Sequence, residues 1–244
     1  MERKYALVTG AARRLGREIA LNLAKDGYDI LLVYNKSDVT QTIADIKKYG
    51  VSCEALKVDL TEYEKIPSFM ENLNNRGYFD GNGLLVNNAS IFMRYFPEDT
   101  TPQILDEIFR VNFFAPYQLS RMFAQYAESG SSIVNIADSK ISKNGTAYSA
   151  YVLSKKALVD MTLQFSAAFA PKIRVNAICP GSVIASINET QECFERRIEK
   201  APMGNAGSVE EILSMIKILH ESKSMTTGQI LYADGGMHVL TGEI

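Results

Sequence analysis

The fold is indicated most directly by the stretch Tyr5-Ala-Leu-Val-Thr-Gly-Ala-Ala-Arg-Arg-Leu-Gly16. Its apolar start reads as a strand that ends at Thr9-Gly10, and a helix-like segment follows as far as Gly27. Glycine lets the backbone approach another group closely, and a helix N-terminus presents free N–H groups and the positive end of its dipole. A strand, a glycine turn and a helix in this order predict a site for a dinucleotide pyrophosphate. The simpler explanation is that any tight strand-to-helix turn needs glycine.

Strand-like and helix-like segments alternate along the rest of the chain. Further strands are predicted at residues 28–34, 51–58, 84–86, 131–137, 173–178 and 229–233. Ser37 is predicted to cap a helix that ends at Gly50, and another helix is predicted over 209–220. Because the strands are apolar on both faces, they predict an α/β fold, a doubly wound parallel sheet flanked by helices. We find no repeat or linker and expect one domain over residues 1–244.

Composition excludes several classes of function. The chain has 244 residues, 46% of them hydrophobic and 22% charged, with a formal net charge of −2. This balance gives no electrostatic reason to expect nucleic acid or a membrane surface as a partner. The start of the chain carries no apolar signal segment, and runs such as Ile30-Leu-Leu-Val33 are too short to cross a bilayer. Three cysteines without metal-ligand spacing predict a reducing cytoplasm and no metal site.

The end of the second predicted strand indicates which dinucleotide binds. It reads Tyr34-Asn-Lys-Ser37 and has no carboxylate before Asp38, whereas a carboxylate there would bind the ribose 2′-hydroxyl of NAD. The charged and hydroxyl donors of Arg13, Arg14, Lys36 and Ser37 could surround a 2′-phosphate. The sequence therefore favours NADP(H), with a merely solvated cationic surface as the alternative.

A candidate proton-transfer group lies later in the chain. Tyr151 and Lys155 are four residues apart and share one face of a predicted helix. A lysine ammonium beside a phenol favours the phenolate, which predicts a lowered pKa for a group that normally titrates at about 10. Asp138, thirteen residues before Tyr151, places a carboxyl group where a hydroxyl would be expected first. Its simpler role would be to cap the local backbone.

These segments together resemble the short-chain dehydrogenase/reductase family. The resemblance is carried by the turn over residues 9–16, Asp59-Leu60, Asn87-Asn88-Ala89, Asn112, Tyr151-x-x-x-Lys155, Pro180-Gly181 and Asp234-Gly-Gly236, in that order. It implies a single Rossmann domain with about seven parallel strands, assembled as a homotetramer. It also implies that Asp59 bonds the adenine, that Asn88 lies against the cofactor and that Lys155 holds the nicotinamide ribose. Asn112 would position a water in a proton relay, or simply bond a helix kink.

Three departures from the common family pattern resemble its pteridine reductase branch, which includes the dihydromonapterin reductases. Most of the family has glycine at the positions of Arg14 and Ser90 and serine at the position of Asp138. Phe92 matches an aromatic residue that, in this branch, sandwiches a pterin against the nicotinamide ring. A flat pterin suits such stacking, and reduction of its C=N bond needs a proton at nitrogen. Taken separately, these residues have simpler explanations. Phe92 could be a core residue, and Ser90 could be a small residue that is tolerated where the chain nears the cofactor.

The resemblance gives a full set of predicted site residues. The catalytic residues are Asp138, Tyr151, Lys155 and Asn112, and the substrate contacts are Arg14, Ser90, Phe92, Asp138 and Tyr151. The cofactor contacts are Gly10, Arg13, Arg14, Leu15, Gly16, Tyr34, Asn35, Lys36, Ser37, Asp59, Leu60, Asn88, Ala89, Ser90, Tyr151, Lys155, Pro180, Gly181 and Ser182.

The expected activity is NADPH-dependent reduction of a dihydropterin, such as dihydromonapterin, dihydrobiopterin or dihydrofolate. A loop with a short helix at about residues 182–203 would cover the substrate, although Ala185 stands where the family usually has threonine. Two alternatives remain open. One is a carbonyl reductase acting on a 3-oxoacyl group or a sugar, although a carboxylate at position 138 would repel a developing oxyanion. The other is a non-catalytic NADP-binding regulator.

Overall fold

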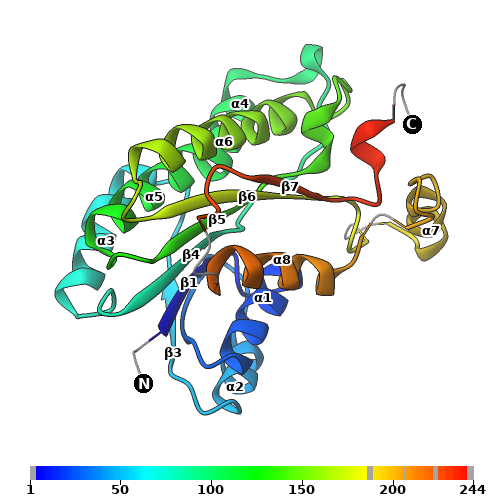
Figure 1. The fold of residues 1–244 in the computed structure, drawn as a ribbon. Helices are drawn as coiled ribbons and strands as arrows, with labels where there is room; N and C mark the ends of the chain where they lie inside the picture. Colours follow the sequence, from blue (N-terminus) through cyan, green and yellow to red (C-terminus); the bar gives the residue numbers. More distant parts are fainter. Residues whose placement is uncertain (1–3, 186–188, 206, 222–224, 241–244) are drawn as a thin grey trace.

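The computed structural model describes residues 4–185, 189–205, 207–221 and 225–240, and within them seven parallel strands form one sheet. The strand order is β3-β2-β1-β4-β5-β6-β7 (Figure 1). The strands are β1 Lys4–Thr9, β2 Asp29–Tyr34, β3 Cys53–Lys57, β4 Asn82–Asn87, β5 Ser132–Ile136, β6 Arg174–Pro180 and β7 Ile230–Ala233. The predicted doubly wound parallel sheet is confirmed, with strand ends that differ from the prediction by a few residues.

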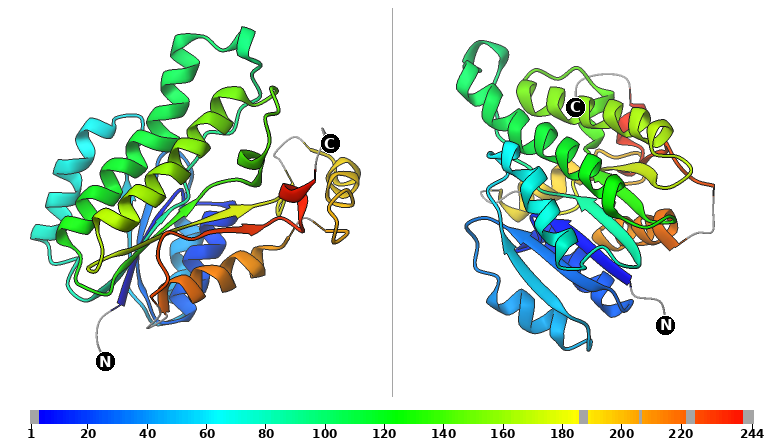
Figure 2. Two further views of the ribbon diagram at one scale, coloured as in Figure 1. Left: turned by 45° about the horizontal axis from the view of Figure 1, so that its top comes forward. Right: turned by 90° about the vertical axis from the view of Figure 1, so that its left-hand side faces the viewer.

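Helices cover both faces of the sheet, and the strand β1 shows why. Alternate side chains of a strand point to opposite faces. Tyr5 and Leu7 pack into one apolar cluster, whereas Ala6 and Val8 pack into another. Figures 1 and 2 show α3–α6 over the first face and α1, α2 and α8 over the second. The helices are α1 Arg14–Lys25, α2 Thr40–Lys47, α3 Ile66–Asn75, α4 Pro102–Phe109, α5 Ala115–Tyr126, α6 Ser149–Ala168, α7 Gln191–Ile198 and α8 Val209–Glu221. None of the described helices combines the length and hydropathy needed to cross a bilayer.

The predicted cap of α2 by Ser37 is wrong. The helix begins at Thr40, and the carboxylate of Asp38 accepts hydrogen bonds from its backbone N–H (2.9 Å) and from its hydroxyl (2.7 Å). An aspartate carboxylate is a strong acceptor for the free N–H groups at a helix start. The helix also ends at Lys47, earlier than the predicted Gly50.

The sheet topology fixes the location of the site. Because all strands are parallel, Gly10, Asn88, Asp138 and Gly181 follow strands that end at the same edge. Strand order reverses at β1, which lies between β2 and β4. In open α/β sheets, ligands bind outside the carboxyl ends of the strands at such a switch point. Figures 1 and 2 show α7 beyond the carboxyl end of β6.

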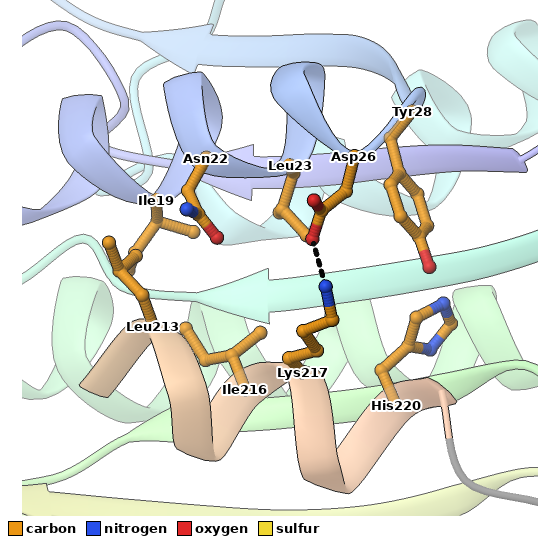
Figure 3. A pocket seen from close by; sticks show the side chains of 9 residues that line it. All are labelled: Ile19, Asn22, Leu23, Asp26, Tyr28, Leu213, Ile216, Lys217 and His220. Atoms are coloured by element: carbon orange, nitrogen blue, oxygen red, sulfur yellow. Dashed lines mark hydrogen bonds and ion pairs between the residues drawn. The ribbon is translucent and has the colours of Figure 1, made fainter. Parts of the chain in front are cut away.

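A small cleft between α1 and α8 lies away from this edge, and it contains none of the predicted site residues. Figure 3 shows Lys217 paired with Asp26 (3.1 Å) above it and His220 beside Tyr28. The imidazole of His220 packs on the Tyr28 ring at a centroid distance of 5.4 Å, and its Nδ1 lies 2.7 Å from the hydroxyl of Ser132. Burial, together with the positive charges of Arg174 and Lys4, lowers the pKa of His220 to about 4.

This buried histidine predicts a pH dependence of stability. The imidazole of the unfolded chain has a pKa near 6.5. Below that pH the unfolded chain binds a proton at His220, whereas the folded protein keeps this side chain neutral down to about pH 4. The unfolding free energy should therefore decline by about 2 kcal/mol between pH 7 and pH 5 from this residue alone. In urea titrations at both pH values, His220→Gln should remove that part of the decline. An identical pH slope in the two proteins would contradict the prediction.

Candidate active site

The glycine turn after β1 is shaped by its contact with the chain after β4. Gly10 has a φ of 66°, and a Cβ there would lie 3.0 Å from the Cα of Ala89. The hydroxyl of Thr9 accepts hydrogen bonds from the backbone N–H groups of Asn88 (2.9 Å) and Ala89 (3.0 Å). The side chain of Asn88 donates to the carbonyl oxygen of Thr9 (2.8 Å). The predicted cofactor residues Gly10, Asn88 and Ala89 thus lie together, and the amide of Asn88 braces the turn.

Gly16 predicts a large effect of a single methyl group. A Cβ at Gly16 would lie 2.3 Å from the carbonyl oxygen of Gly10 and 2.5 Å from Nδ2 of Asn88. Because both neighbours are fixed, Gly16→Ala should open the turn, cost about 2 kcal/mol of stability and weaken dinucleotide binding. Thermal unfolding with and without NADP measures both effects. Gly145→Ala is the matched control, since nothing lies within 4 Å of a Cβ there; equal behaviour of the two variants would contradict the prediction.

Arg14 adopts a conformation that normally belongs to glycine. Its φ is 53°, and within the described ranges it is the one non-glycine residue with a positive φ. Such a backbone costs roughly 1–2 kcal/mol, which indicates that the side chain has a role that offsets it. Nη2 of Arg14 donates to the carbonyl oxygen of Ala185 at 2.7 Å, so the guanidinium links the turn to the segment after β6. Arg13 is exposed beside it, and Leu15 packs partly against the core.

The residues that follow β2 lie near Asp59, which follows β3. Asp59 accepts hydrogen bonds from the backbone N–H (3.0 Å) and hydroxyl (2.7 Å) of Thr61. These bonds lower the pKa of Asp59, and the side chain of Asn35 and the charge of Lys36 contribute to the same shift. Asn35 and Lys36 are both exposed. The remaining predicted residues here, Tyr34 and Ser37, are partly exposed, and Leu60 is buried.

Asp138 and Tyr151 form a direct pair. The phenol of Tyr151 donates to Oδ2 of Asp138 at 2.7 Å. Oδ1 of Asp138 accepts from the backbone N–H of Lys140 at 2.7 Å and so caps the short helix Ser139–Ser142. The capping role and the tyrosine contact therefore coexist, one on each carboxylate oxygen.

The predicted lowering of the Tyr151 pKa is wrong. Burial raises the pKa of Tyr151 well above 10, and the neighbouring negative charge and hydrogen bond of Asp138 raise it further. Nζ of Lys155 lies 6.0 Å from the centre of the phenol ring and donates to the carbonyl oxygen of Ile136 at 2.8 Å. Burial lowers the pKa of Lys155 to about 8, against the opposing effect of Asp138. Burial and the carboxylate of Asp138 therefore outweigh the ammonium of Lys155, and the phenol keeps its proton at neutral pH.

Asn112 lies in a π-helical turn, Arg110–Phe114, between α4 and α5. Its side-chain oxygen accepts from the backbone N–H of Ile91 (2.8 Å) and the hydroxyl of Ser90 (3.2 Å). Its amide group donates to the carbonyl oxygen of Ile91 and the hydroxyl of Ser154, both at 3.0 Å. The side chain is thus fully bonded to protein groups and holds the loop after β4 against α6. A relay water would therefore have to bond the backbone carbonyl oxygen of Asn112 and not its side chain. A π-helical turn, such as the one that contains Asn112, often occurs at a functional site.

Phe92 is not a core residue, because 43% of it is exposed. Its ring meets the ring of Tyr151 edge to face at 4.8 Å and stacks on Tyr148 at 4.7 Å with 9° between the planes. The structure therefore brings Phe92 to the tyrosine–aspartate pair. Sequence reasoning missed Tyr148, although an aromatic residue three positions before Tyr151 was a usable signal.

The segment after β6 contacts the end of β7 and the helix α7. The backbone N–H of Gly181, next to Pro180, donates to the carbonyl oxygen of Ala233 (2.7 Å). The hydroxyl of Ser182 accepts from the guanidinium of Arg197 on α7, so in this arrangement it faces that helix. The predicted covering segment 182–203 contains α7, and its residues 186–188 lie outside the described ones.

Comparisons with known proteins identify the family to which this fold belongs. A family model described as Enoyl-(Acyl carrier protein) reductase matches residues 10–238. The dihydromonapterin reductase of Klebsiella pneumoniae is 26% identical over 94% of this chain and 95% of its own length. The 3-oxoacyl-[acyl-carrier-protein] reductase FabG of Aquifex aeolicus is 27% identical over 97% and 98%, respectively.

The structure is also similar to a solved one. That protein is the FolM Alternative dihydrofolate reductase 1 from Brucella suis in complex with NADP, with a TM-score of 0.89 and 31% identity over 98% of this chain and 96% of the other. The fold, the order of its motifs and these matches lead to one conclusion: the chain belongs to the short-chain dehydrogenase/reductase family.

Proposed function

We propose that this oxidoreductase uses NADPH to reduce a dihydropterin to a tetrahydropterin. One observation carries the proposal: Tyr151 donates a 2.7 Å hydrogen bond to the carboxylate of Asp138, beside the exposed ring of Phe92. The similarity to a dihydromonapterin reductase and to a FolM dihydrofolate reductase supports it.

The residues at the carboxyl edge suit NADP(H). The glycine turn leads into the N-terminus of α1, where free N–H groups favour a pyrophosphate. Lys36 is an exposed cation just after β2, Arg13 is exposed on the turn after β1, and both fit a 2′-phosphate. The guanidinium of Arg14 instead reaches the carbonyl oxygen of Ala185 after β6. The bound cofactor supplies the hydride that the reduction requires.

Tyr151 is the proposed proton donor. Its raised pKa keeps the phenol protonated at neutral pH, so the group acts as an acid. Because it is only 5% exposed, bulk water does not compete strongly for the proton. Lys155 stays buried beside it, bonded to Ile136, and its positive charge is lost as the pH rises through about 8.

Asp138 sets the kind of bond that can be reduced. A carboxylate stabilises the positive charge that develops when a ring nitrogen takes up a proton, and a protonated C=N bond accepts a hydride more readily. The same carboxylate repels the oxyanion that forms when a ketone is reduced. The Asp138–Tyr151 pair therefore favours C=N over C=O.

Phe92 provides the proposed surface for the substrate ring. Phe92 is partly exposed and its ring contacts the ring of Tyr151. A flat bicyclic ring that stacks on Phe92 would therefore have an edge near the phenol. Offset stacking adds about 0.5–1.5 kcal/mol to the burial of such a ring.

A substrate panel tests the proposal. NADPH oxidation is followed with dihydromonapterin, dihydrobiopterin, dihydrofolate and a 3-oxoacyl thioester, and we expect turnover of pterins but not of the thioester. Strong turnover of the thioester with none of the pterins would overturn the proposal. NADPH binding without turnover of any substrate would indicate the regulator instead.

A carbonyl reductase is the second candidate. It is favoured by one specific observation, the similarity to FabG of Aquifex aeolicus, which is as close as that to the dihydromonapterin reductase. The carboxylate at position 138 argues against it for the electrostatic reason given above.

A further inference from the structure

Lys140 places an ammonium group beside the aromatic pair at the active site. Its Nζ lies 5.6 Å from the ring centre of Phe92 and 5.9 Å from that of Tyr148. Among the described residues it donates no hydrogen bond, and its ion-pair partner, Oδ1 of Asp138, is 3.9 Å away. Both oxygens of that carboxylate already accept hydrogen bonds, from the backbone N–H of Lys140 and from Tyr151. The ammonium of Lys140 is therefore left with unused donors at the rim of the site.

Lys143 adds a second ammonium group on the same turn. Its backbone N–H donates to the carbonyl oxygen of Lys140 at 3.0 Å, which closes the turn. Nζ of Lys143 is buried, yet within the part of the chain that the structure describes it has no hydrogen-bond partner. A buried charged donor without an acceptor is costly, so a site of this kind suits an anion that arrives with a ligand. The next residue on this loop, Asn144, accepts a hydrogen bond from the ammonium of Lys156 on α6 (3.0 Å).

We propose that Lys140 and Lys143 form a subsite for a carboxylate on the tail of the pterin substrate. The inference rests on the proposed function and narrows its substrate class. A bicyclic ring stacked on Phe92 has an edge near the ammonium of Lys140, so a substituent that leaves this edge would extend over the turn that carries Lys140 and Lys143. A carboxylate can accept hydrogen bonds from these ammonium groups, whereas a neutral polyol tail brings no negative charge to the unpartnered ammonium of Lys143. The preferred substrate is then a dihydropterin with an anionic extension.

The test compares two substrates with the same reactive ring. Dihydrofolate carries carboxylates on its tail, and dihydromonapterin carries a neutral polyol. The readout is the ratio of kcat/KM for dihydrofolate to kcat/KM for dihydromonapterin, in the full-length enzyme with saturating NADPH. We expect Lys140→Gln and Lys143→Gln each to lower this ratio about fivefold to tenfold, mainly through the KM for dihydrofolate. Lys156→Gln, the matched control, should leave the ratio unchanged.

Salt provides an independent readout. Added salt should lower the ratio in the wild type, because screening weakens ionic recognition, and should change it less in Lys140→Gln. Turnover of dihydromonapterin together with an unchanged ratio in both lysine variants overturns the subsite but leaves the proposed function standing. No turnover of either pterin overturns both. If the lysine variants lower kcat equally for both substrates, the subsite is also overturned. Lys140 would then act only through its ion pair with Asp138 and not on the substrate tail.

Discussion

Replacement of Tyr151 by phenylalanine is expected to lower kcat for dihydropterin reduction by about 10²–10⁴-fold, the usual contribution of a positioned general acid. The substitution removes one oxygen and leaves the ring that contacts Phe92 at 4.8 Å. Because only the proton donor is lost, the Kd for NADPH should change little. Stopped-flow reduction and fluorescence titration with NADPH measure the two quantities separately.

Tyr49→Phe is the matched control for this experiment. Tyr49 is an exposed tyrosine just after α2, so loss of its hydroxyl should leave kcat unchanged. The wild-type pH profile adds a second check, because the raised pKa of Tyr151 excludes titration of the phenol below pH 10. A decline near pH 8 would instead reflect Lys155, whose pKa is lowered to about 8. Retention of full kcat in Tyr151→Phe would assign the proton to another group.

The sheet was predictable from sequence because its strands are apolar on both faces and alternate with helices. Glycines also marked the turn after β1, where the structure shows a backbone approach that a Cβ would block. The cap at Ser37 failed because Asp38, one residue later, offers the stronger acceptor. The single domain, the homotetramer and the cytoplasmic location stay predictions.

The electrostatics of the site could not be read from spacing. The spacing of four positions from Tyr151 to Lys155 indicates a shared helix face, but not that the ammonium of Lys155 bonds the carbonyl oxygen of Ile136. The effect of burial and of Asp138 on the phenol depends on how two loops pack, which no periodicity encodes. For the same reason the contact between Lys140 and Phe92 could not be predicted, since 48 positions separate the two residues.

Replacement of Asp138 by serine is expected to lower kcat/KM for the dihydropterin by about 10²-fold, because it removes the charge that stabilises a protonated ring nitrogen. Serine is a good N-cap, so the short helix Ser139–Ser142 should keep its start. The phenol of Tyr151 then loses its carboxylate acceptor, and its pKa should fall toward the ordinary value. Asp138→Ala should lose as much activity as Asp138→Ser, although alanine cannot cap the short helix Ser139–Ser142.

Asp160→Ser is the matched control, since Asp160 is an exposed aspartate on α6. Its kcat/KM should equal that of the wild type, and all variants should bind NADPH alike.

The most direct test of the Asp138–Tyr151 pair is kcat/KM for NADPH-dependent dihydropterin reduction in Asp138→Ser beside the wild type. If the carboxylate of Asp138 supports C=N reduction, kcat/KM for the dihydropterin should fall strongly in Asp138→Ser while the Kd for NADPH stays unchanged. Full retention of dihydropterin reduction in Asp138→Ser would contradict that role.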